Sequence, residues 1–260
     1  MKVADVVRVL ETLAPSALAE EWDNVGLLVG DLNRPVQRAM TCLTVTPTTA
    51  AEALREAADL VVSHHPLPFQ PLARLTADTT TGRLLLGLAG GRVAVYSPHT
   101  AWDSAAEGIN QQLARLLALR GISPLVPAAE GQGTGRGGWL EEPLALDRLA
   151  ERVKELLGLG HVQVVGRSGQ SIRTVAVACG AAGELLEPAR KGGYDCLLTG
   201  EARFHTCLEA EAWGVAMILV GHYASERLGA ERLAELLAAQ FPGLEVWASR
   251  EERDVARWLA

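Results

Sequence analysis

The sequence has few of the features that mark a secreted or membrane-spanning protein. Aromatic residues make up only 5% of its 260 residues, and its 4 cysteines include no C-x-x-C pair. Its apolar runs, such as Ala216–Val220, are far shorter than the roughly 20 residues of a membrane span. The N-terminal segment carries Asp5, Arg8 and Glu11 among its apolar residues, so it lacks the core of a signal peptide. We therefore expect a cytoplasmic protein with free thiols and no membrane contact.

Positive charge is also scarce. The chain has 24 Lys and Arg residues against 31 Asp and Glu residues, which gives a formal net charge of −7. This balance disfavours a broad cationic surface, so nucleic acid is not an expected partner. Hydrophobic residues make up 48% of the chain and charged residues 21%, which is close to the average of globular proteins. The length allows one large or two ordinary domains.

Short apolar runs alternate with helix-like segments along the chain. Leu60–Ser63, Arg92–Ser97 and Val215–Val220 have the length and composition of buried strands. Helices are expected between such strands, for example at Thr48–Ala58, where Thr46 and a following proline favour a helix start. This alternation predicts an α/β fold with two lobes that each contain a sheet.

The composition changes between Gly121 and Gly138, where two prolines and several glycines occur. We interpret this segment as a flexible connection between the lobes. A phosphate cradle is the less favoured interpretation, because no Lys-Ser/Thr follows as in a P-loop. The predicted first lobe spans residues 1–125, with a return of residues 225–260 to it left open, and the second lobe spans residues 126–224.

Three of the expected strands end in side chains that bind metal ions. Leu60–Ser63 is followed by His64 and His65, Arg92–Ser97 by the segment PHTAWD, and Val215–Val220 by the segment GHYASE. Ligands of open α/β sheets bind beyond the carboxyl ends of the strands. Imidazole and carboxylate together suit Zn, Fe, Mn, Co or Ni. The coincidence of three such strand ends favours a metal site.

Each of these segments taken alone also has a structural interpretation. In a regular strand His64 and His65 would point to opposite faces, but Pro66 ends that regularity. The two histidines therefore serve one metal site, two different ions, or only a turn. Asp103 is also in position to cap a helix expected at Ala105–Leu119.

Several further side chains keep two interpretations. Glu226 lies four residues after His222, so the two are either an ordinary helical pair or two ligands on one helix face. His99 is either a contact of the substrate or of a ligand, or a structural residue. Glu201 and His205 follow a strand end and would line the same pocket, although Glu201 is as well suited to cap a helix.

The remaining motifs say what kind of nucleophile to expect. No G-x-S-x-G elbow and no Ser-His-Asp order occur in the sequence, so an activated serine is not expected. Any hydrolysis would therefore depend on metal ions.

Trp22, Trp102 and Trp139 either stack on a planar base or lie in the core, which is the commoner place for an aromatic side chain.

Six segments resemble, in order, the motifs of the Nif-three-like proteins, which are also labelled GTP cyclohydrolase I type 2 homologues. They are Trp22–Asp31 (WDNVGLLVGD), Ser63–Phe69 (SHHPLPF), Ser97–Asp103 (SPHTAWD), Gly133–Leu140 (GTGRGGWL), Thr199–His205 (TGEARFH) and Gly221–Glu226 (GHYASE). The resemblance covers nearly the whole chain, in the short form without an inserted domain. The tail Arg250–Ala260 departs from the usual ending of the family.

The resemblance implies a Nif-three-like fold, a two-lobed α/β sandwich with mixed sheets. It also implies a ring-shaped homohexamer with its metal sites facing an internal cavity, and two divalent transition-metal ions per chain. The implied metal ligands are His64, His65, Asp103, His222 and Glu226.

The leading hypothesis for function is a dinuclear-metal-dependent hydrolase. Two metal ions can polarise a carbonyl, phosphoryl or amidine group and activate water. The family label suggests that a nucleotide is the substrate and that the guanine imidazole ring of GTP is opened. The catalytic candidates are Glu226, His99 and Glu201. The alternatives are a phosphoesterase and a non-catalytic, metal-binding hexamer that acts as a regulatory scaffold.

Overall fold

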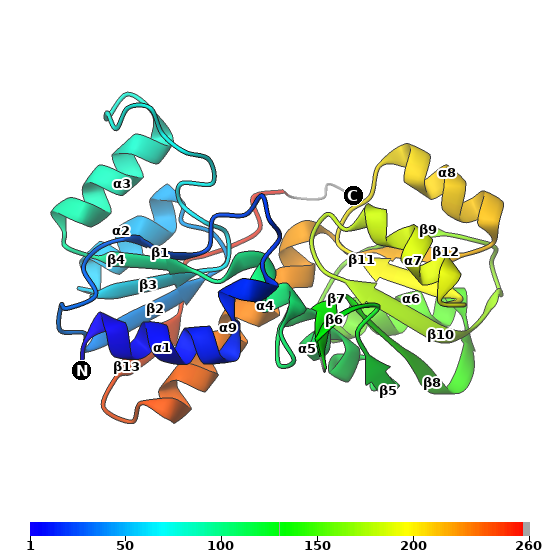
Figure 1. The fold of residues 1–260 in the computed structure, drawn as a ribbon. Helices are drawn as coiled ribbons and strands as arrows, with labels where there is room; N and C mark the ends of the chain where they lie inside the picture. Colours follow the sequence, from blue (N-terminus) through cyan, green and yellow to red (C-terminus); the bar gives the residue numbers. More distant parts are fainter. Residues whose placement is uncertain (130, 257–260) are drawn as a thin grey trace. The chain divides into compact units, whose positions relative to one another are not determined.

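The structure, a computed structural model, describes residues 1–129 and 131–256. Within them the chain forms two compact units, each with its own sheet and helices (Figure 1). The first unit contains Met1–Trp102 and the described part of Gly229–Ala260, and the second contains Asp103–Leu228. The predicted α/β class with mixed sheets is confirmed, because each unit pairs parallel and antiparallel strands in one sheet. The predicted domain limits stay predictions, because compactness does not show which parts fold alone.

The first unit has a five-stranded sheet in the order β1-β4-β3-β2-β13, antiparallel between β1 and β4 and parallel elsewhere. Its strands are β1 (Gly26–Val29), β2 (Arg38–Cys42), β3 (Leu60–Ser63), β4 (Ala94–Ser97) and β13 (Glu245–Ala248). Its helices are α1 (Val3–Leu13), the 3-10 turn η1 (Ser16–Leu18), α2 (Pro47–Arg55) and α3 (Thr80–Gly90). The chain passes between the units within α4 (His99–Ser104) and within α9 (His222–Gln240).

Both faces of this sheet are covered by helices, as the alternation of side chains along β2 shows. Met40 and Cys42 belong to a buried cluster that includes residues of α2 and α3. The hydroxyl of Thr41, which lies between them, donates a hydrogen bond of 2.7 Å to the carbonyl of Ala230 in α9. Since neighbours along a strand point to opposite faces, α2 and α3 cover one face and α9 the other (Figure 1).

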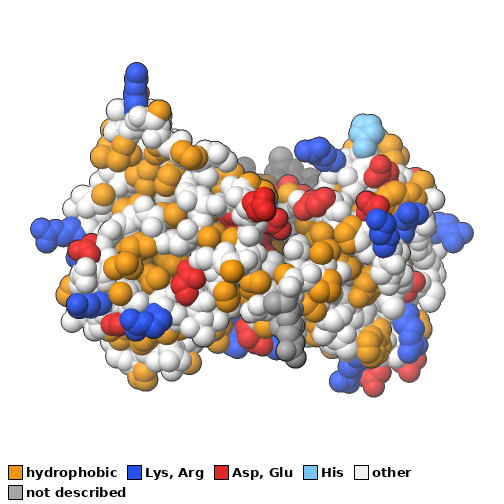
Figure 2. Space-filling model, viewed as in Figure 1, with side chains coloured by type: hydrophobic (Ala, Val, Ile, Leu, Met, Phe, Trp, Pro, Cys, Tyr) orange, Lys and Arg blue, Asp and Glu red, His pale blue; other side chains and the backbone are white. Residues whose placement is uncertain are grey.

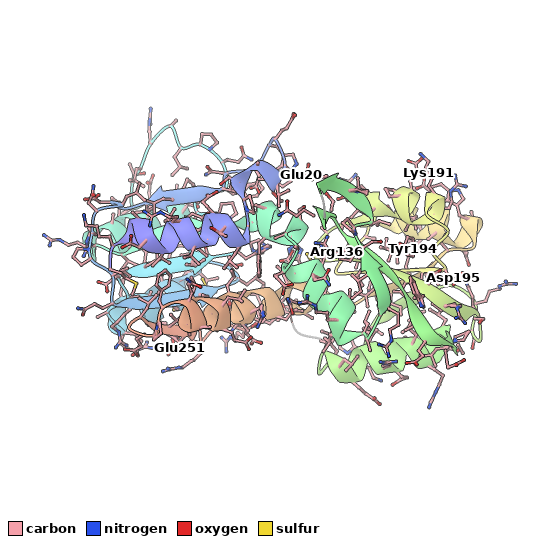
Figure 3. The ribbon with its side chains drawn as sticks, turned by 60° about the horizontal axis from the view of Figure 1, so that its bottom comes forward. Glu20, Arg136, Lys191, Tyr194, Asp195 and Glu251 are labelled. Atoms are coloured by element: carbon pink, nitrogen blue, oxygen red, sulfur yellow. The ribbon has the colours of Figure 1, made fainter. Side chains whose placement is uncertain are left out.

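The C-terminal segment is held in the first unit by the buried carboxylate of Glu52 in α2. It accepts hydrogen bonds from the indole nitrogen of Trp247 (3.2 Å) and from the backbone nitrogens of Arg250 (2.9 Å) and Glu251 (3.2 Å). Burial alone would raise the pKa of Glu52, but these donors hold it below its ordinary value. Glu251 is labelled in Figure 3. β13 and the residues after it therefore complete the first unit.

The second unit has a six-stranded sheet in the order β5-β8-β10-β11-β12-β9 and a separate β6-β7 hairpin. Its strands are β5 (Arg120–Ser123), β6 (Val126–Ala129), β7 (Gln132–Thr134), β8 (Arg136–Ala145), β9 (Gln163–Val165), β10 (Ser171–Ala178), β11 (Cys196–Thr199) and β12 (Ala216–Leu219). Its helices are α5 (Ile109–Leu116), α6 (Leu146–Leu156), the 3-10 turn η2 (Gly183–Leu185), α7 (Leu186–Lys191) and α8 (Phe204–Trp213). β10, β11 and β12 are parallel, so their carboxyl ends share one edge of the sheet.

The flexible connection expected at Gly121–Gly138 is wrong, since this segment contributes to β5, β6, β7 and the start of β8. Its glycines allow close packing. A Cβ atom at Gly137 would overlap the ring of Tyr194, and one at Gly138 would crowd the carbonyl of Arg120. Tyr194 is labelled in Figure 3. Glycine in these strands therefore marks the close approach of a ring and of a neighbouring backbone.

The surface carries charges of both signs. Figure 2 shows cationic and anionic side chains interspersed with apolar ones on the drawn face of each unit. Large apolar side chains are also exposed, among them Trp22, Phe69 and Phe204. Among the described residues, no helix combines the length and the apolar composition that a membrane span requires.

Candidate metal centre

Two neighbouring parallel strands of the first unit end in histidines. His64 and His65 follow β3, and His99 follows β4, which pairs with β3. The hydroxyl of Ser97 donates to the carbonyl of His64 (2.6 Å), and that of Ser63 donates to the carbonyl of His65 (2.8 Å). Hydroxyls at the strand ends thus hold the backbone that carries the adjacent histidines.

The three imidazoles gather at one place. The ring centroids of His64 and His65 lie 5.1 Å apart, and His99 lies 5.1 Å from His64 and 5.6 Å from His65. One ring nitrogen from each residue can be chosen so that all three lie within 4.8 Å of one another. His64 is fully buried and His99 nearly so. Imidazole nitrogen is a preferred ligand of transition-metal ions, so rings of this group fit such an ion.

Asp23 orients the ring of His99, whose backbone has the uncommon φ of +30°. Oδ1 of Asp23 lies 2.7 Å from Nδ1 of His99, and Oδ2 accepts the backbone N–H of Thr100 at 3.2 Å. Burial would raise the pKa of Asp23, but the hydrogen bonds from His99 and Thr100 lower it to about 2. Asp23 is therefore an ionised acceptor, and it favours a proton on Nδ1 of His99.

His65 is oriented by Thr44, whose hydroxyl lies 2.7 Å from Nδ1 of the ring. The backbone at this point is held by the carboxylate of Glu252, which accepts the N–H groups of Leu43 (2.8 Å) and Thr44 (2.7 Å). The C-terminal segment thus supports the loop that positions one of the predicted ligands.

The second unit gathers carboxylates around one imidazole, where β11 and β12 end. Nε2 of His222 lies 3.0 Å from Oε2 of Glu226, and Nδ1 lies 3.5 Å from Oε1 of Glu201. The hydrogen bond to Glu226 raises the pKa of His222, burial opposes it, and the charges of Glu226, Glu201 and Asp103 raise it further. These carboxylates favour a positive charge at this point of the unit.

Asp103 does not cap a helix as one interpretation of the sequence held, because it lies inside α4 and Gly108 is the N-cap of α5. Its Oδ1 accepts a hydrogen bond from Sγ of Cys179 (3.2 Å), and its carbonyl accepts one from Nδ2 of Asn110 (3.1 Å). Asn110 in turn accepts the backbone N–H of Cys179 at 2.7 Å. Burial and the charges of Asp103 and Glu226 raise the pKa of Cys179, so the thiol keeps its proton and donates it.

Two glycines let the strand ends approach the first turn of α9. Gly180 has a φ of +65°, and a Cβ atom there would collide with the carboxylate of Glu226. A Cβ atom at Gly200 would collide with the hydroxyl of Ser225 and the carbonyl of Gly180. In return, Ser225 accepts the backbone N–H of Gly180 at 2.9 Å. A larger side chain at Gly180 would displace Glu226, and one at Gly200 would displace Ser225 or the backbone of Gly180.

The structure groups the predicted residues within each unit. In the first unit His64 and His65 lie together with His99, and in the second His222 lies with Glu226 and Glu201. Sequence motifs did not single out the residues that orient them, which are Asp23, Thr44, Asn110 and Cys179. His205 is exposed on α8. Of the tryptophans considered for stacking, Trp102 is buried in the core, whereas Trp22 and Trp139 are exposed.

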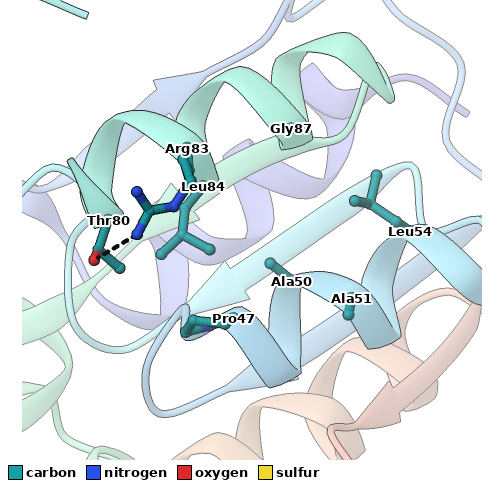
Figure 4. A pocket seen from close by; sticks show the side chains of 8 residues that line it. All are labelled: Pro47, Ala50, Ala51, Leu54, Thr80, Arg83, Leu84 and Gly87. Carbon is teal, nitrogen blue, oxygen red and sulfur yellow. Dashed lines mark hydrogen bonds between the residues drawn. The ribbon is translucent and has the colours of Figure 1, made fainter. Parts of the chain in front are cut away.

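A groove in the first unit lies between α2 and α3 (Figure 4). Its volume is about 230 Å³, and its lining is mostly apolar, including Pro47, Leu54 and Leu84. Arg83 at one side donates a hydrogen bond of 3.2 Å to the hydroxyl of Thr80. None of the predicted site residues lines this groove, so the metal chemistry is not assigned to it.

Comparisons with known proteins identify the family of the chain. The chain matches the family Duf34/NIF3 (NGG1p interacting factor 3) over residues 1–254. It is 34% identical over 264 residues to the GTP cyclohydrolase 1 type 2 homolog of Streptomyces coelicolor, covering 97% of this chain and 93% of that protein. The corresponding homolog of Clostridium acetobutylicum is 33% identical over 229 residues, which covers 87% of this chain and 85% of that protein.

A solved structure supports the fold. The Bacillus cereus protein related to NIF3 superposes with a TM-score of 0.92 at 21% identity, covering 100% of this chain and 99% of that one. At this identity the likeness shows the fold alone. The family match, by contrast, spans residues 1–254. Because that match and the two relatives each span most of the sequence, the chain belongs to the Duf34/NIF3 family.

Proposed function

We propose that the chain is a hydrolase that depends on two divalent transition-metal ions. The proposed ligands are His64, His65, Asp103, His222 and Glu226. The observation that carries the proposal is that the imidazoles of two proposed ligands, His64 and His65, converge in the first unit beside that of His99. One ring nitrogen of each can be chosen within 4.8 Å of the others. The ligands proposed in the second unit are an imidazole and two carboxylates, and carboxylate oxygens are donors that two-metal hydrolytic sites use.

The orienting residues have definite roles in this proposal. Divalent transition-metal ions, when bound, act as Lewis acids and lower the pKa of bound water. Asp23 keeps the proton of His99 on Nδ1, so Nε2 is the atom that can accept a proton from water or substrate. Cys179 holds the carboxylate of Asp103 in place. Glu201, whose side chain is 56% exposed beside His222, is the second candidate for proton exchange with a substrate.

The names of the relatives support a nucleotide as the substrate. The proteins of Streptomyces coelicolor and Clostridium acetobutylicum are named GTP cyclohydrolase 1 type 2 homologs. In the reaction that this name suggests, water adds to the carbon between the two imidazole nitrogens of guanine and a C–N bond breaks. GTP is therefore the first substrate to test, followed by phosphoesters. A metal-loaded chain without turnover would support the non-catalytic scaffold instead.

We expect about two transition-metal ions per chain after purification without chelators, as in two-metal sites. His64→Ala and His222→Ala should each lower this content, because each removes a proposed ligand from a different unit. Elemental analysis of the purified proteins checks the prediction. His161→Ala is the matched control, since this exposed histidine lies outside both clusters. Wild-type metal content in both ligand variants would contradict the assignment.

We also propose that the chain assembles as a homohexamer, on the strength of the family resemblance. Closed symmetric assemblies are the usual form of homo-oligomers. Light scattering at micromolar concentration should then give about 166 kDa, six times the chain mass of 27.7 kDa. A mass near that of one chain would overturn the proposal.

A further inference from the structure

Two aromatic side chains of the first unit lie next to each other in contact with solvent. Trp22 is 59% exposed and Phe69 is 48% exposed, and their ring centroids lie 6.0 Å apart with an angle of 44° between the planes. Covering a large aromatic side chain lowers the free energy of the protein. A pair left open in a chain with only 5% aromatic residues therefore needs an explanation.

Hydrogen bonds fix the chain segments that carry the two rings. The backbone N–H of Glu20, labelled in Figure 3, donates to the hydroxyl of Thr100 at 3.0 Å. Asp23 binds His99 and Thr100, and Nδ2 of Asn24 donates to the carbonyl of Pro68 at 2.7 Å. The segment that carries Trp22 is thus fixed to the start of α4 and to the residue before Phe69. The backbone that carries the two rings is thus already fixed, so a ligand that binds there pays little entropy for ordering that backbone.

The same pair adjoins the imidazole cluster. The ring centroids of Trp22 and Phe69 each lie 6.0 Å from that of His99, and both rings meet His99 edge to face. Exposure falls from Trp22 through Phe69 to His99 (9%) and His64 (0%). The aromatic pair is therefore the solvent-facing end of a continuous set of rings whose inner end is the proposed metal centre.

The composition of this outer end indicates what it would bind. Tryptophan and phenylalanine rings stack on the flat π-system of a nucleobase or a similar heteroaromatic ring, whatever its substituents. The exposed residues just before Trp22 are Glu20 and Glu21, whose charges would repel a phosphate chain. Recognition here would thus rest on the ring of the ligand and not on its phosphates.

We propose that Trp22 and Phe69 form a stacking subsite for a planar heteroaromatic ring, which places the edge of that ring toward the imidazole cluster. The proposal deepens the proposed function, on which it rests, by assigning two residues that select a base-containing substrate. Asp23 serves both parts, because it orients His99 and anchors the segment that carries Trp22.

The test measures binding of guanosine, GTP and ribose 5-phosphate by calorimetry, on the full chain with and without a chelator. We expect guanosine and GTP to bind and ribose 5-phosphate to bind far more weakly. Trp22→Leu and Phe69→Leu should each weaken guanosine binding roughly 5- to 150-fold, the range for loss of a base-stacking ring. Trp22→Phe should restore most of the affinity, since it restores a flat ring.

The control is Trp139→Leu, which removes a tryptophan of similar exposure (45%) from the second unit and should bind guanosine like the wild type. Metal content should stay at the wild-type value in all four variants. Guanosine that fails to bind, or that binds Trp22→Leu and Phe69→Leu as tightly as wild type, would overturn the subsite. A chain that retains no metal after purification without chelators would refute the hydrolase. If its guanosine binding still depended on Trp22, the subsite would be supported all the same.

Discussion

Replacing Glu226 by glutamine is expected to lower turnover of GTP by about 1,000-fold or more, as loss of a residue essential to a catalytic unit does. The side chain of Glu226 is only 5% exposed, and its Oε2 lies 3.0 Å from Nε2 of His222. Glutamine has the same shape and can still form this hydrogen bond, so the fold should persist. It lacks the negative charge that a cation at this site would need, so metal content should fall together with turnover.

His99→Ala should lower turnover less, by roughly 10- to 100-fold, and should leave metal content close to wild type. His99 is not among the proposed ligands, and under the proposed function it contacts or protonates the substrate. Turnover of GTP and metal content of the two variants, each measured with and without a chelator, check both expectations. Glu235→Gln, on the exposed face of the same helix, is the control and should match the wild type.

Two results would contradict the hydrolase. One is activity that survives removal of the metal, and the other is a Glu226→Gln protein as fast as the wild type. The metal content of Glu226→Gln remains informative even if no nucleotide is turned over. A value below that of Glu235→Gln would still identify Glu226 as a ligand.

Much of the fold could be predicted from local sequence patterns. Leu60–Ser63 was predicted with its observed limits, because a buried parallel strand is a continuous apolar run with a polar end. The flexible connection predicted for Gly121–Gly138 was wrong for a physical reason. Its glycines are needed where Tyr194 and a neighbouring backbone approach closely, and that need arises only after distant parts of the chain have packed.

The candidate site was predictable only in part. His64 and His65 follow an apolar strand of one sheet, and His222 follows an apolar strand of the other. The position of each at the carboxyl edge of its own sheet could therefore be inferred from the chain order. Asp23 and Cys179 could not be inferred in this way. Asp23 contacts His99 across 76 residues, and Cys179 contacts Asp103 across the same separation. Such pairs depend on tertiary packing, for which the periodicity of the sequence carries no signal.

Arg136 should matter more to stability than any other charged residue considered above. The side chain, labelled in Figure 3, is fully buried, and burial together with the nearby charge of Arg115 lowers its pKa to about 10. Its guanidinium donates 2.7 Å hydrogen bonds to the carbonyls of Gly133 and Gly135, and one of 2.6 Å to that of Ala105. It thus joins the β7-β8 turn to the residues that follow Asp103.

Arg136→Met is therefore expected to lower the free energy of unfolding by about 3–5 kcal/mol, because several carbonyls lose a charged donor at once. The free energy of unfolding of Arg136→Lys should lie between those of the wild type and Arg136→Met, since lysine keeps the charge but has three donors in place of five. Urea unfolding followed by circular dichroism measures both. The control is Arg120→Met in β5, whose exposed ion pair with Glu141 (3.1 Å) should contribute less than about 1 kcal/mol.

An Arg136→Met protein that unfolds at the wild-type urea concentration would show that the turn and the residues after Asp103 are held by other contacts. If the guanidinium does hold them, a folded Arg136→Met protein should also bind less metal, because Ser104 and Ala105 directly follow a proposed ligand.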